Sequence, residues 1–259
     1  MTETKYTKEK AIELYNSFDS LYQKRVEAFE YILSPYLEVV NDYGQLFSRI
    51  SFITGFIPPK NDFESIQRNL SSDAFDFLNE TKNSILRGHF DIAFPIARRS
   101  FETLTLMIAF YFDNDLAKKW ENGQQIPNRK VRSILNNHKE IGGESKESLQ
   151  ELYNYFSESS HPNRTAIPHR LIGLGNYFAL GPFPEPMLLP IIDLCIEIIN
   201  LWFWLLVYYW SYNLDYVEKH DNSFKSEYLR KKTRVMEVKK WLIDQRENLI
   251  NELKNELNK

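Results

Sequence analysis

The sequence has little cysteine and little glycine. It contains nine glycines and a single cysteine, Cys195, so neither a disulfide framework nor a multi-cysteine zinc site can form within one chain. It also lacks a glycine-rich phosphate loop, a His-Glu-x-x-His zinc motif and a nucleophile elbow, which disfavours the enzyme classes that these motifs mark. Residues Met1 to Asp19 have no apolar core typical of a secretory signal. We therefore expect a cytoplasmic protein without a cofactor or bound metal.

An excess of basic charge is also missing from the chain as a whole. The net charge of -3 and the pI of about 6.0 argue against a globally basic nucleic-acid binder. One local exception lies between residues 225 and 246, which hold eight basic and three acidic residues. Its densest part contains Arg230, Lys231, Lys232 and Arg234. The simpler interpretation of this run is a solvated helix face. The alternative is a patch that contacts nucleic acid or a partner protein.

Apolar residues recur at spacings of three and four through most of the chain, which predicts an all-α helical bundle. We expect a helical hairpin in residues 1–59, ended by two prolines, a bundle in residues 60–213, and a basic amphipathic helix in residues 214–259. Residues 160–190 hold six of the 11 prolines and are expected to form a connecting segment. The expected helices cover approximately residues 7–33, 36–56, 61–87, 92–112, 115–121, 128–137, 146–159, 191–212 and 225–259.

The most apolar segment, Ile191 to Tyr212, has the length of a membrane span. Asp193, Glu197 and Asn200 share one face of it, which leaves only Leu201 to Tyr212 without strongly polar side chains. That remainder is too short to cross a bilayer, which needs about 20 apolar residues. We therefore expect a buried bundle helix, and membrane association through this segment is the alternative.

The expected helix over residues 92–112 is apolar on nearly all sides, so it should pack in the middle of the bundle. Its only charged residues are Arg98, Arg99 and Glu102. Arg98 and Glu102 stand four residues apart, so the simpler interpretation is an intrahelical ion pair. Because buried charges must be paired or face a cavity, the alternative is a polar pocket that these three residues share with His161. His161 precedes a proline at the end of a helix, where it could instead interact with the last carbonyls.

Three runs in the middle of the chain resemble the HEPN superfamily of helical bundles. They are LRGHFDIAFPIARRSFETLTLMIAFYF, DLAKKW and ELYNYFSESSHPN. They are similar to a poorly characterised bacterial branch, in which an Arg-rich helix carrying a Glu precedes a Leu-Tyr-x-x-x-Ser helix that ends in His-Pro. The resemblance covers about Asn61 to Tyr212. It implies a homodimer of prokaryotic antiviral defence or toxin–antitoxin type that interacts with RNA or with a partner protein.

Active members of this superfamily are metal-independent ribonucleases, whose motif is Arg, four to six residues, then His. Arg stabilises phosphate charge and His assists proton transfer. The resemblance implies that the catalytic candidates are His161, Arg98, Arg99 and Glu102, but no arginine lies four to six residues before His161. Two pairs have the spacing, and about 0.75 such pairs are expected by chance. They are Arg132 with His138 and Arg164 with His169. This departure favours a non-catalytic bundle over an active ribonuclease.

The residues suggest three further interpretations, a metal site, an oligomerisation module and a membrane-surface protein. Glu158 and His161 have the Glu-x-x-His spacing of di-metal bundles, with Asp193 and Glu197 as further oxygen donors, but such bundles use two of these motifs. We therefore predict no metal site. A non-enzymatic oligomerisation module, with its contacts on the terminal helices, is the main alternative to an RNA-interacting protein. A membrane-surface protein using Leu201 to Tyr212 is the third hypothesis.

Overall fold

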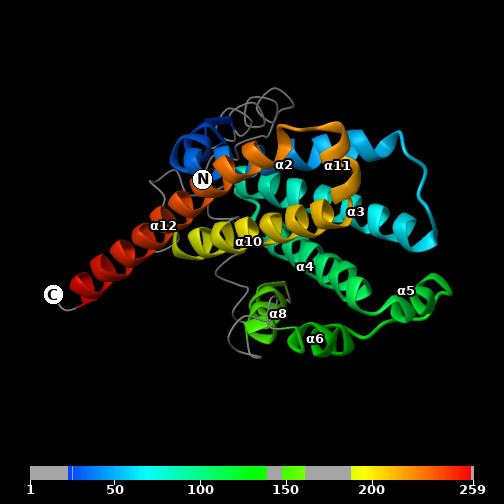
Figure 1. Cartoon of the computed structure of the whole chain (residues 1–259). Coiled ribbons are helices and arrows are strands. Elements are labelled where there is room, and N and C mark those ends of the chain that lie inside the picture. Colours follow the sequence, from blue (N-terminus) through cyan, green and yellow to red (C-terminus); the bar gives the residue numbers. More distant parts are fainter. Residues whose placement is uncertain (1–22, 25, 139–147, 161–187, 258–259) are drawn as a thin grey trace, which may run out of the picture.

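The computed structural model describes residues 23–24, 26–138, 148–160 and 188–257. All regular elements in these ranges are helices, which confirms the predicted all-α fold (Figure 1). The expected helix over residues 7–33 is described only in part, and residues 26–32 are helical. The helices that follow are α2 (Ser34–Gly55), α3 (Asp62–Leu86), α4 (Phe90–Phe112), α5 (Asn114–Glu121), α6 (Asn128–Asn136), α8 (Ser148–Ser160), α10 (Leu188–Tyr212), α11 (Leu214–His220) and α12 (Phe224–Leu257).

Helix ends follow local signals in the sequence. Asn61 accepts a hydrogen bond from the backbone N–H of Glu64 at 2.9 Å, and the Glu64 carboxylate accepts one from the N–H of Lys60 at 2.7 Å. The first bond satisfies a donor that the first turn of α3 leaves free, and the second ties the residue before the N-cap to the helix. Gly88 follows the other end of α3 with φ of 70°, a conformation that glycine adopts without strain. Helix α3 thus ends at Leu86, within one residue of the end that the sequence predicted.

Helix α10 lies at the centre of the bundle and packs against α2, α3, α4 and α12 (Figure 1). Helix α4 packs against α3 on one side and against α6 and α8 on another, as its nearly uniform apolar pattern predicts. Its fully buried side chains include Phe94, Phe101, Leu104, Ile108 and Phe110. The prediction that this helix sits in the middle of the bundle is thus confirmed.

The core is continuous across the three segments that the sequence suggested. Buried residues of α2, α3, α4, α10 and α12 form a single hydrophobic cluster. At its centre the rings of Phe47 and Phe75 stack at 4.6 Å, and Phe75 meets the edge of Trp202 at 5.5 Å. Phe47 also stacks on Tyr209 at 4.7 Å. The prolines at residues 58 and 59 therefore separate two helices, whereas α2 shares its core with the rest of the chain.

Helix α10 is long and apolar enough to cross a membrane, but it is built into the core. A stretch from Leu189 to Tyr212 meets the length and composition of a span, and 56% of its most apolar window is buried inside the protein. Its side chains at Leu194, Cys195 and Ile198 have no exposed surface. The helix begins at Leu188, earlier than the sequence suggested, because the proline at position 190 is tolerated in the first turn.

Candidate functional site

A polar cluster joins α4, α6 and α8 on one side of the bundle. Its centre is Arg98, whose Nε atom donates a hydrogen bond to Oε1 of Glu102 at 3.0 Å. The Nη2 atom of Arg98 donates to the hydroxyl of Tyr153 at 3.0 Å. Both charged side chains are largely buried, with exposed fractions of 23% and 20%. The predicted ion pair on α4 therefore forms, and α8 closes over it.

Glu102 also fixes the start of α6. Its Oε1 atom accepts a second hydrogen bond, from Nδ2 of Asn128 at 2.9 Å. Asn128 is the first residue of α6, and this short helix rests on α4 through the buried side chains of Val131 and Leu135. One carboxylate oxygen thus holds both an arginine of its own helix and the first residue of α6.

Two arginines lie close to the ring of Tyr153. The guanidinium carbon of Arg98 is 5.2 Å from the ring centroid, and that of Arg132 is 4.0 Å from it. Such contacts attract the cation to the face of the ring. The Nε atom of Arg132 donates to Oε1 of Gln150 at 3.1 Å, while its Nη1 atom is buried without a hydrogen-bond partner in the described part of the chain. An unsatisfied buried donor is costly, so Arg132 has hydrogen-bonding capacity left for an acceptor.

Two hollows flank this cluster. The first has a volume of about 670 Å³ and includes Arg99, Glu102, Trp120 and Asn128 in its lining. The second has a volume of about 530 Å³, and its lining consists of Arg129, Arg132, Ser133, Asn136, Asn137, Gln150 and Glu151. Both volumes are in the range of small-molecule sites. Both hollows adjoin the start of α6, because Asn128 lines the first and Arg129 lines the second.

Helix α6 carries a concentrated positive charge that the sequence analysis missed except for Arg132. Its nine residues, NRKVRSILN, include three basic and no acidic side chains. Arg129 and Lys130 are exposed, while Val131 is buried against the bundle. Three basic residues within four positions were visible in the sequence. They were overshadowed by the longer run in residues 225–246.

The structure describes only some of the histidines and arginines that the sequence marked as catalytic candidates. His161, Arg164 and His169 lie outside the described residues, so the predicted pocket is described only through its arginines and Glu102. Arg99 is exposed, with its guanidinium carbon 5.8 Å from the ring of Phe77, and it lines the first hollow with Glu102.

The pair formed by Arg132 and His138 is described completely. Arg132 contacts α8 through Tyr153 and Gln150, whereas the His138 ring stacks on Phe112 of α4 at 3.7 Å. The two members of this pair thus contact different helices, and only Arg132 lines the second hollow.

The oxygen atoms proposed as metal donors have other partners. Oδ1 of Asp193 accepts a hydrogen bond from Nε of Arg246 at 2.5 Å. Glu197 accepts one from Asn200 at 3.1 Å, and Asn200 in turn accepts one from Lys239 at 2.7 Å. Within the described ranges, no group of three or more His, Cys, Asp or Glu side chains is arranged to hold a metal. The polar stripe of α10 instead serves as the surface on which α12 docks.

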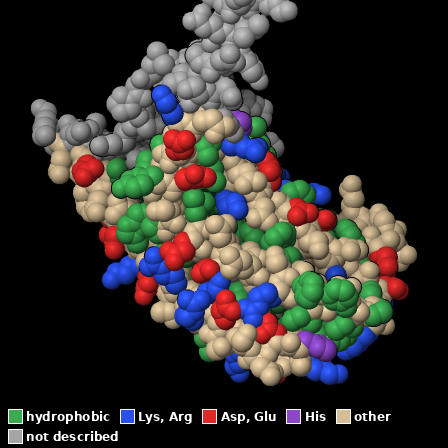
Figure 2. Space-filling view, turned by 90° about the horizontal axis from the view of Figure 1, so that it is seen from above, with side chains coloured by type: hydrophobic (Ala, Val, Ile, Leu, Met, Phe, Trp, Pro, Cys, Tyr) green, Lys and Arg blue, Asp and Glu red, His purple; other side chains and the backbone are tan. Residues whose placement is uncertain are grey.

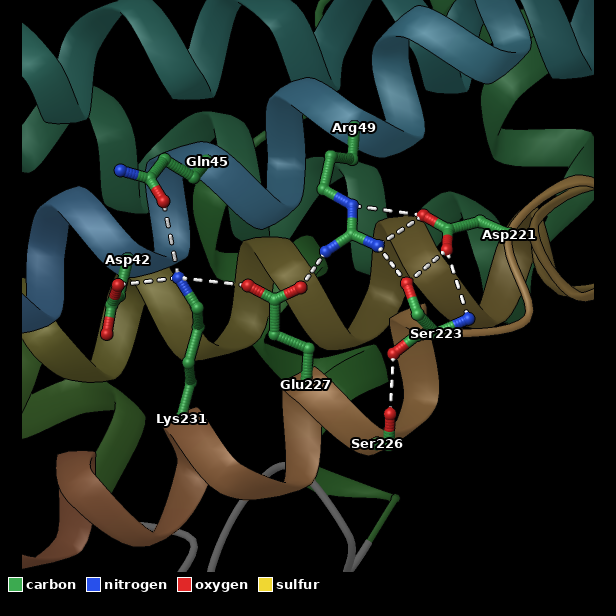
Figure 3. A network of polar contacts seen from close by, with 8 residues as sticks. All are labelled: Asp42, Gln45, Arg49, Asp221, Ser223, Ser226, Glu227 and Lys231. Atoms are coloured by element: carbon green, nitrogen blue, oxygen red, sulfur yellow. Dashed lines mark hydrogen bonds and ion pairs between the residues drawn. The ribbon is translucent and has the colours of Figure 1, made fainter.

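The basic run of α12 is partly used in a network that ties α12 to α2 (Figure 3). Nζ of Lys231 lies 2.5 Å from Oδ1 of Asp42 and 3.5 Å from Oε1 of Glu227, and Lys231 is only 3% exposed. Arg49 of α2 pairs with Glu227 and, at 2.5 Å, with Asp221. Lys231 therefore belongs to the interior of the protein, which corrects its place in the predicted surface patch.

The remaining residues of that predicted patch are exposed, but their surroundings are mixed in charge. Arg234 pairs with Glu38 at 2.9 Å and with Glu237 at 3.2 Å, while Arg230 and Lys232 are exposed. Figure 2 shows the upper side of the molecule in Figure 1, where basic and acidic side chains are intermixed. The acidic partners Glu38 and Glu237 of Arg234 interrupt the basic run of α12 in the same way.

The pKa values of three carboxyl groups follow from these contacts. Burial raises the pKa of Asp221, but hydrogen bonds from Ser223 and Arg49 and the charge of Arg49 outweigh it, so the pKa is lowered. The pKa of Glu227 is lowered in the same way, because the hydrogen bond and charge of Arg49 outweigh burial. Burial raises the pKa of Glu197 above its usual value, and the hydrogen bond from Asn200 opposes this only in part.

No protein-family model, curated protein or solved structure matches this chain.

Proposed function

We propose that this chain is a HEPN-like protein that binds single-stranded RNA through the surface of α6, without cleaving it. The observation that carries the proposal is the position of Arg129 and Arg132, which line a hollow of about 530 Å³ on a helix without acidic residues. Proteins bind the RNA backbone mainly by placing arginine and lysine near phosphates. The resemblance of the sequence adds the proposed context of prokaryotic defence or toxin–antitoxin systems.

The surroundings of α6 suit a flexible RNA strand. Trp120 lines the neighbouring hollow and is 37% exposed, so part of its ring is open for a base to stack on. Arg99 and Asn128 lie in the same lining and offer hydrogen-bond donors. Base stacking on aromatic rings combined with backbone contacts to basic residues is the usual way in which proteins hold single-stranded RNA.

The geometry favours binding over cleavage. A general base must come within hydrogen-bond reach of the hydroxyl that it activates. His138 is stacked on Phe112, and Arg98 is already paired with Glu102 and Tyr153. The described part of the cluster thus offers phosphate-binding groups, with its one nearby imidazole engaged elsewhere.

The test compares two double variants that each remove two positive charges. Arg129→Gln with Lys130→Gln removes two exposed charges from α6, and Arg230→Gln with Lys232→Gln removes two exposed charges from α12. We expect the α6 variant to bind a fluorescein-labelled oligouridine at least about tenfold more weakly. The slope of the logarithm of its binding constant against the logarithm of the salt concentration should become less steep by about 0.7 for each lost phosphate contact. The α12 variant should bind like the wild type. Fluorescence polarisation between about 50 and 200 mM salt measures both quantities.

Two binding results would contradict the proposed interface. Equal affinities of the α6 variant and the wild type would remove α6 from the interface, and loss of binding in the α12 variant alone would move the interface to α12. Cleavage is tested separately by incubating the same RNA with wild type and with His161→Ala and separating the products on a denaturing gel. We expect intact RNA with both proteins, whereas cleavage that disappears in His161→Ala would establish a ribonuclease.

A further inference from the structure

Helix α12 carries an apolar stripe that faces solvent. Leu229, Met236 and Ile243 are 53%, 62% and 41% exposed, and each follows the previous one by seven positions. Ile250 continues the spacing and is half-buried. Residues seven apart lie on nearly the same side of an α-helix, and repetition at this interval is the pattern by which two helices pair. We name Leu229, Met236, Ile243 and Ile250 the outer stripe.

The outer stripe is separate from the face with which α12 docks on the bundle. The docking face includes Tyr228, Val235 and Leu242, which are all at most 5% exposed. Leu229, Met236 and Ile243 each directly follow one of these residues, so each is turned from the docking face by about 100°. The helix therefore has two apolar surfaces, and the bundle covers only one of them.

The exposed charges of α12 divide between its two halves. In residues 224–243, the exposed charged residues are five basic and one acidic, namely Lys225, Arg230, Lys232, Arg234, Lys240 and Glu237. In residues 244–255 they are three acidic and one basic, namely Asp244, Glu247, Glu252 and Lys254. Two such helices attract each other when they run in opposite directions, because the basic half of one then faces the acidic half of the other.

We propose that the outer stripe binds the outer stripe of a second copy of this chain, with the two α12 helices antiparallel. A twofold axis between Met236 and Ile243 places each of these opposite the other in the second copy, and it places Leu229 opposite Ile250. The same register brings Lys232 near Glu247 of the second copy. A twofold contact of this kind is self-complementary and closes at the dimer.

The fold leaves room for this arrangement. In Figure 1 the second half of α12 extends beyond the other labelled helices, so a second helix can approach along it. The proposal is independent of RNA binding, because α6 and α12 are different surfaces of the bundle. A negative RNA-binding result would therefore not contradict the dimer, and a negative dimer result would not contradict RNA binding.

Sedimentation of the full chain tests the surface. We expect the wild type to pass from monomer to dimer between about 1 and 100 μM, since a contact of this size is small. Met236→Lys with Ile243→Lys should shift the dissociation constant upward by at least about tenfold. The control is Asn248→Lys with Asn255→Lys, which adds the same charge to exposed positions of the same helix and should leave the dimer intact. Far-ultraviolet circular dichroism confirms that both variants remain helical.

Cysteine crosslinking tests the direction of the helices. The native Cys195 is fully buried, so it does not compete for an oxidant at the surface. We expect a mixture of the Lys232→Cys and Glu247→Cys chains to form a disulfide-linked dimer, with one chain tagged to identify the mixed product. Each variant alone should crosslink slowly, because equal positions are then separated by about 22 Å along the axis at 1.5 Å per residue.

Three results would overturn the proposal. Crosslinking of Lys232→Cys chiefly with itself would show parallel helices. A dimer unaffected by Met236→Lys with Ile243→Lys would place the contact elsewhere. A wild type that sediments as a monomer throughout the range would also reject it, whether the outer stripe is covered by residues 1–22 of the same chain or by another protein.

Discussion

The Nζ atom of Lys231 lies 2.5 Å from the Oδ1 atom of Asp42, a residue 189 positions earlier in the chain. Lys231 is 3% exposed, whereas the side chain of Asp42 is 25% exposed. Gln45 and Glu227 complete the surroundings of the ammonium group at 3.3 and 3.5 Å (Figure 3). The two ends of the described chain are thus joined by a charge that water barely reaches, and such a charge must be paired.

The first prediction concerns this pair. Asp42→Asn should lower the free energy of unfolding by about 2 kcal/mol, because it leaves a buried ammonium with only weaker partners. Lys231→Met should cost less, since the Asp42 carboxylate can then be solvated. Urea unfolding followed by circular dichroism measures both. The control is Glu38→Gln in an exposed pair with Arg234, where we expect a change of at most about 0.5 kcal/mol.

The second prediction concerns acid. Asp221 and Glu227 have pKa values lowered in the folded state, so their contribution to stability is present above the unfolded pKa and is lost as the pH falls through the folded pKa. As the pH falls below about 4, the free energy of unfolding should therefore decrease more in the wild type than in an Arg49→Met variant. That variant lacks the guanidinium that lowers both pKa values. Urea midpoints from about pH 6 to pH 3 measure this difference. Parallel curves for the two proteins would contradict it.

The third prediction concerns Glu197, whose effect on stability changes with pH in the opposite direction to that of Asp221 and Glu227. Burial raises the pKa of Glu197, so folding favours its protonated form, and this contribution is lost as the pH rises from the unfolded to the folded pKa. Glu197→Gln should therefore raise the urea midpoint at pH 7 and leave it unchanged at about pH 3. The amide oxygen can still accept the hydrogen bond from Asn200. A lower midpoint at pH 7 would show that the charge is needed to hold Lys239 and α12.

The fourth prediction separates two neighbouring arginines. Arg98→Ala should lower the free energy of unfolding by about 1–2 kcal/mol, because it removes hydrogen bonds to Glu102 and Tyr153 and leaves the carboxylate less well paired. Arg99→Ala changes an exposed residue and should stay within about 0.5 kcal/mol. Thermal and urea unfolding of both variants measure the contrast. Equal effects would mean that the Arg98 contacts add little stability.

Helices were predictable because their apolar spacing is local. Helix α4 was expected over residues 92–112 and runs from Phe90 to Phe112, and the pair of Arg98 with Glu102 follows from a separation of four residues. Helix α11 was not predicted, since it has only seven residues and offers too little periodicity.

Contacts between distant residues were not predictable in the same way. No sequence pattern states that Arg132 lies over Tyr153, or that Lys231 meets Asp42, because these contacts depend on how the helices pack. The polar stripe of Asp193, Glu197 and Asn200 was recognised in the sequence and used there as the argument against a membrane span. Its second role, as the docking surface for Arg246 and Lys239, required the arrangement of α10 and α12.

The long separation between α2 and α12 also affects how the protein must be made. The buried side chains of α2, such as Tyr36 and Tyr43, belong to a helix that packs against α10 and α12, which the ribosome produces much later. At roughly 5–20 residues per second, translation from Asp42 to Lys231 takes roughly 10–40 s. Throughout that interval the apolar face of α2 lacks its packing partners α10 and α12. A chaperone that covers this face would therefore raise the yield of folded protein.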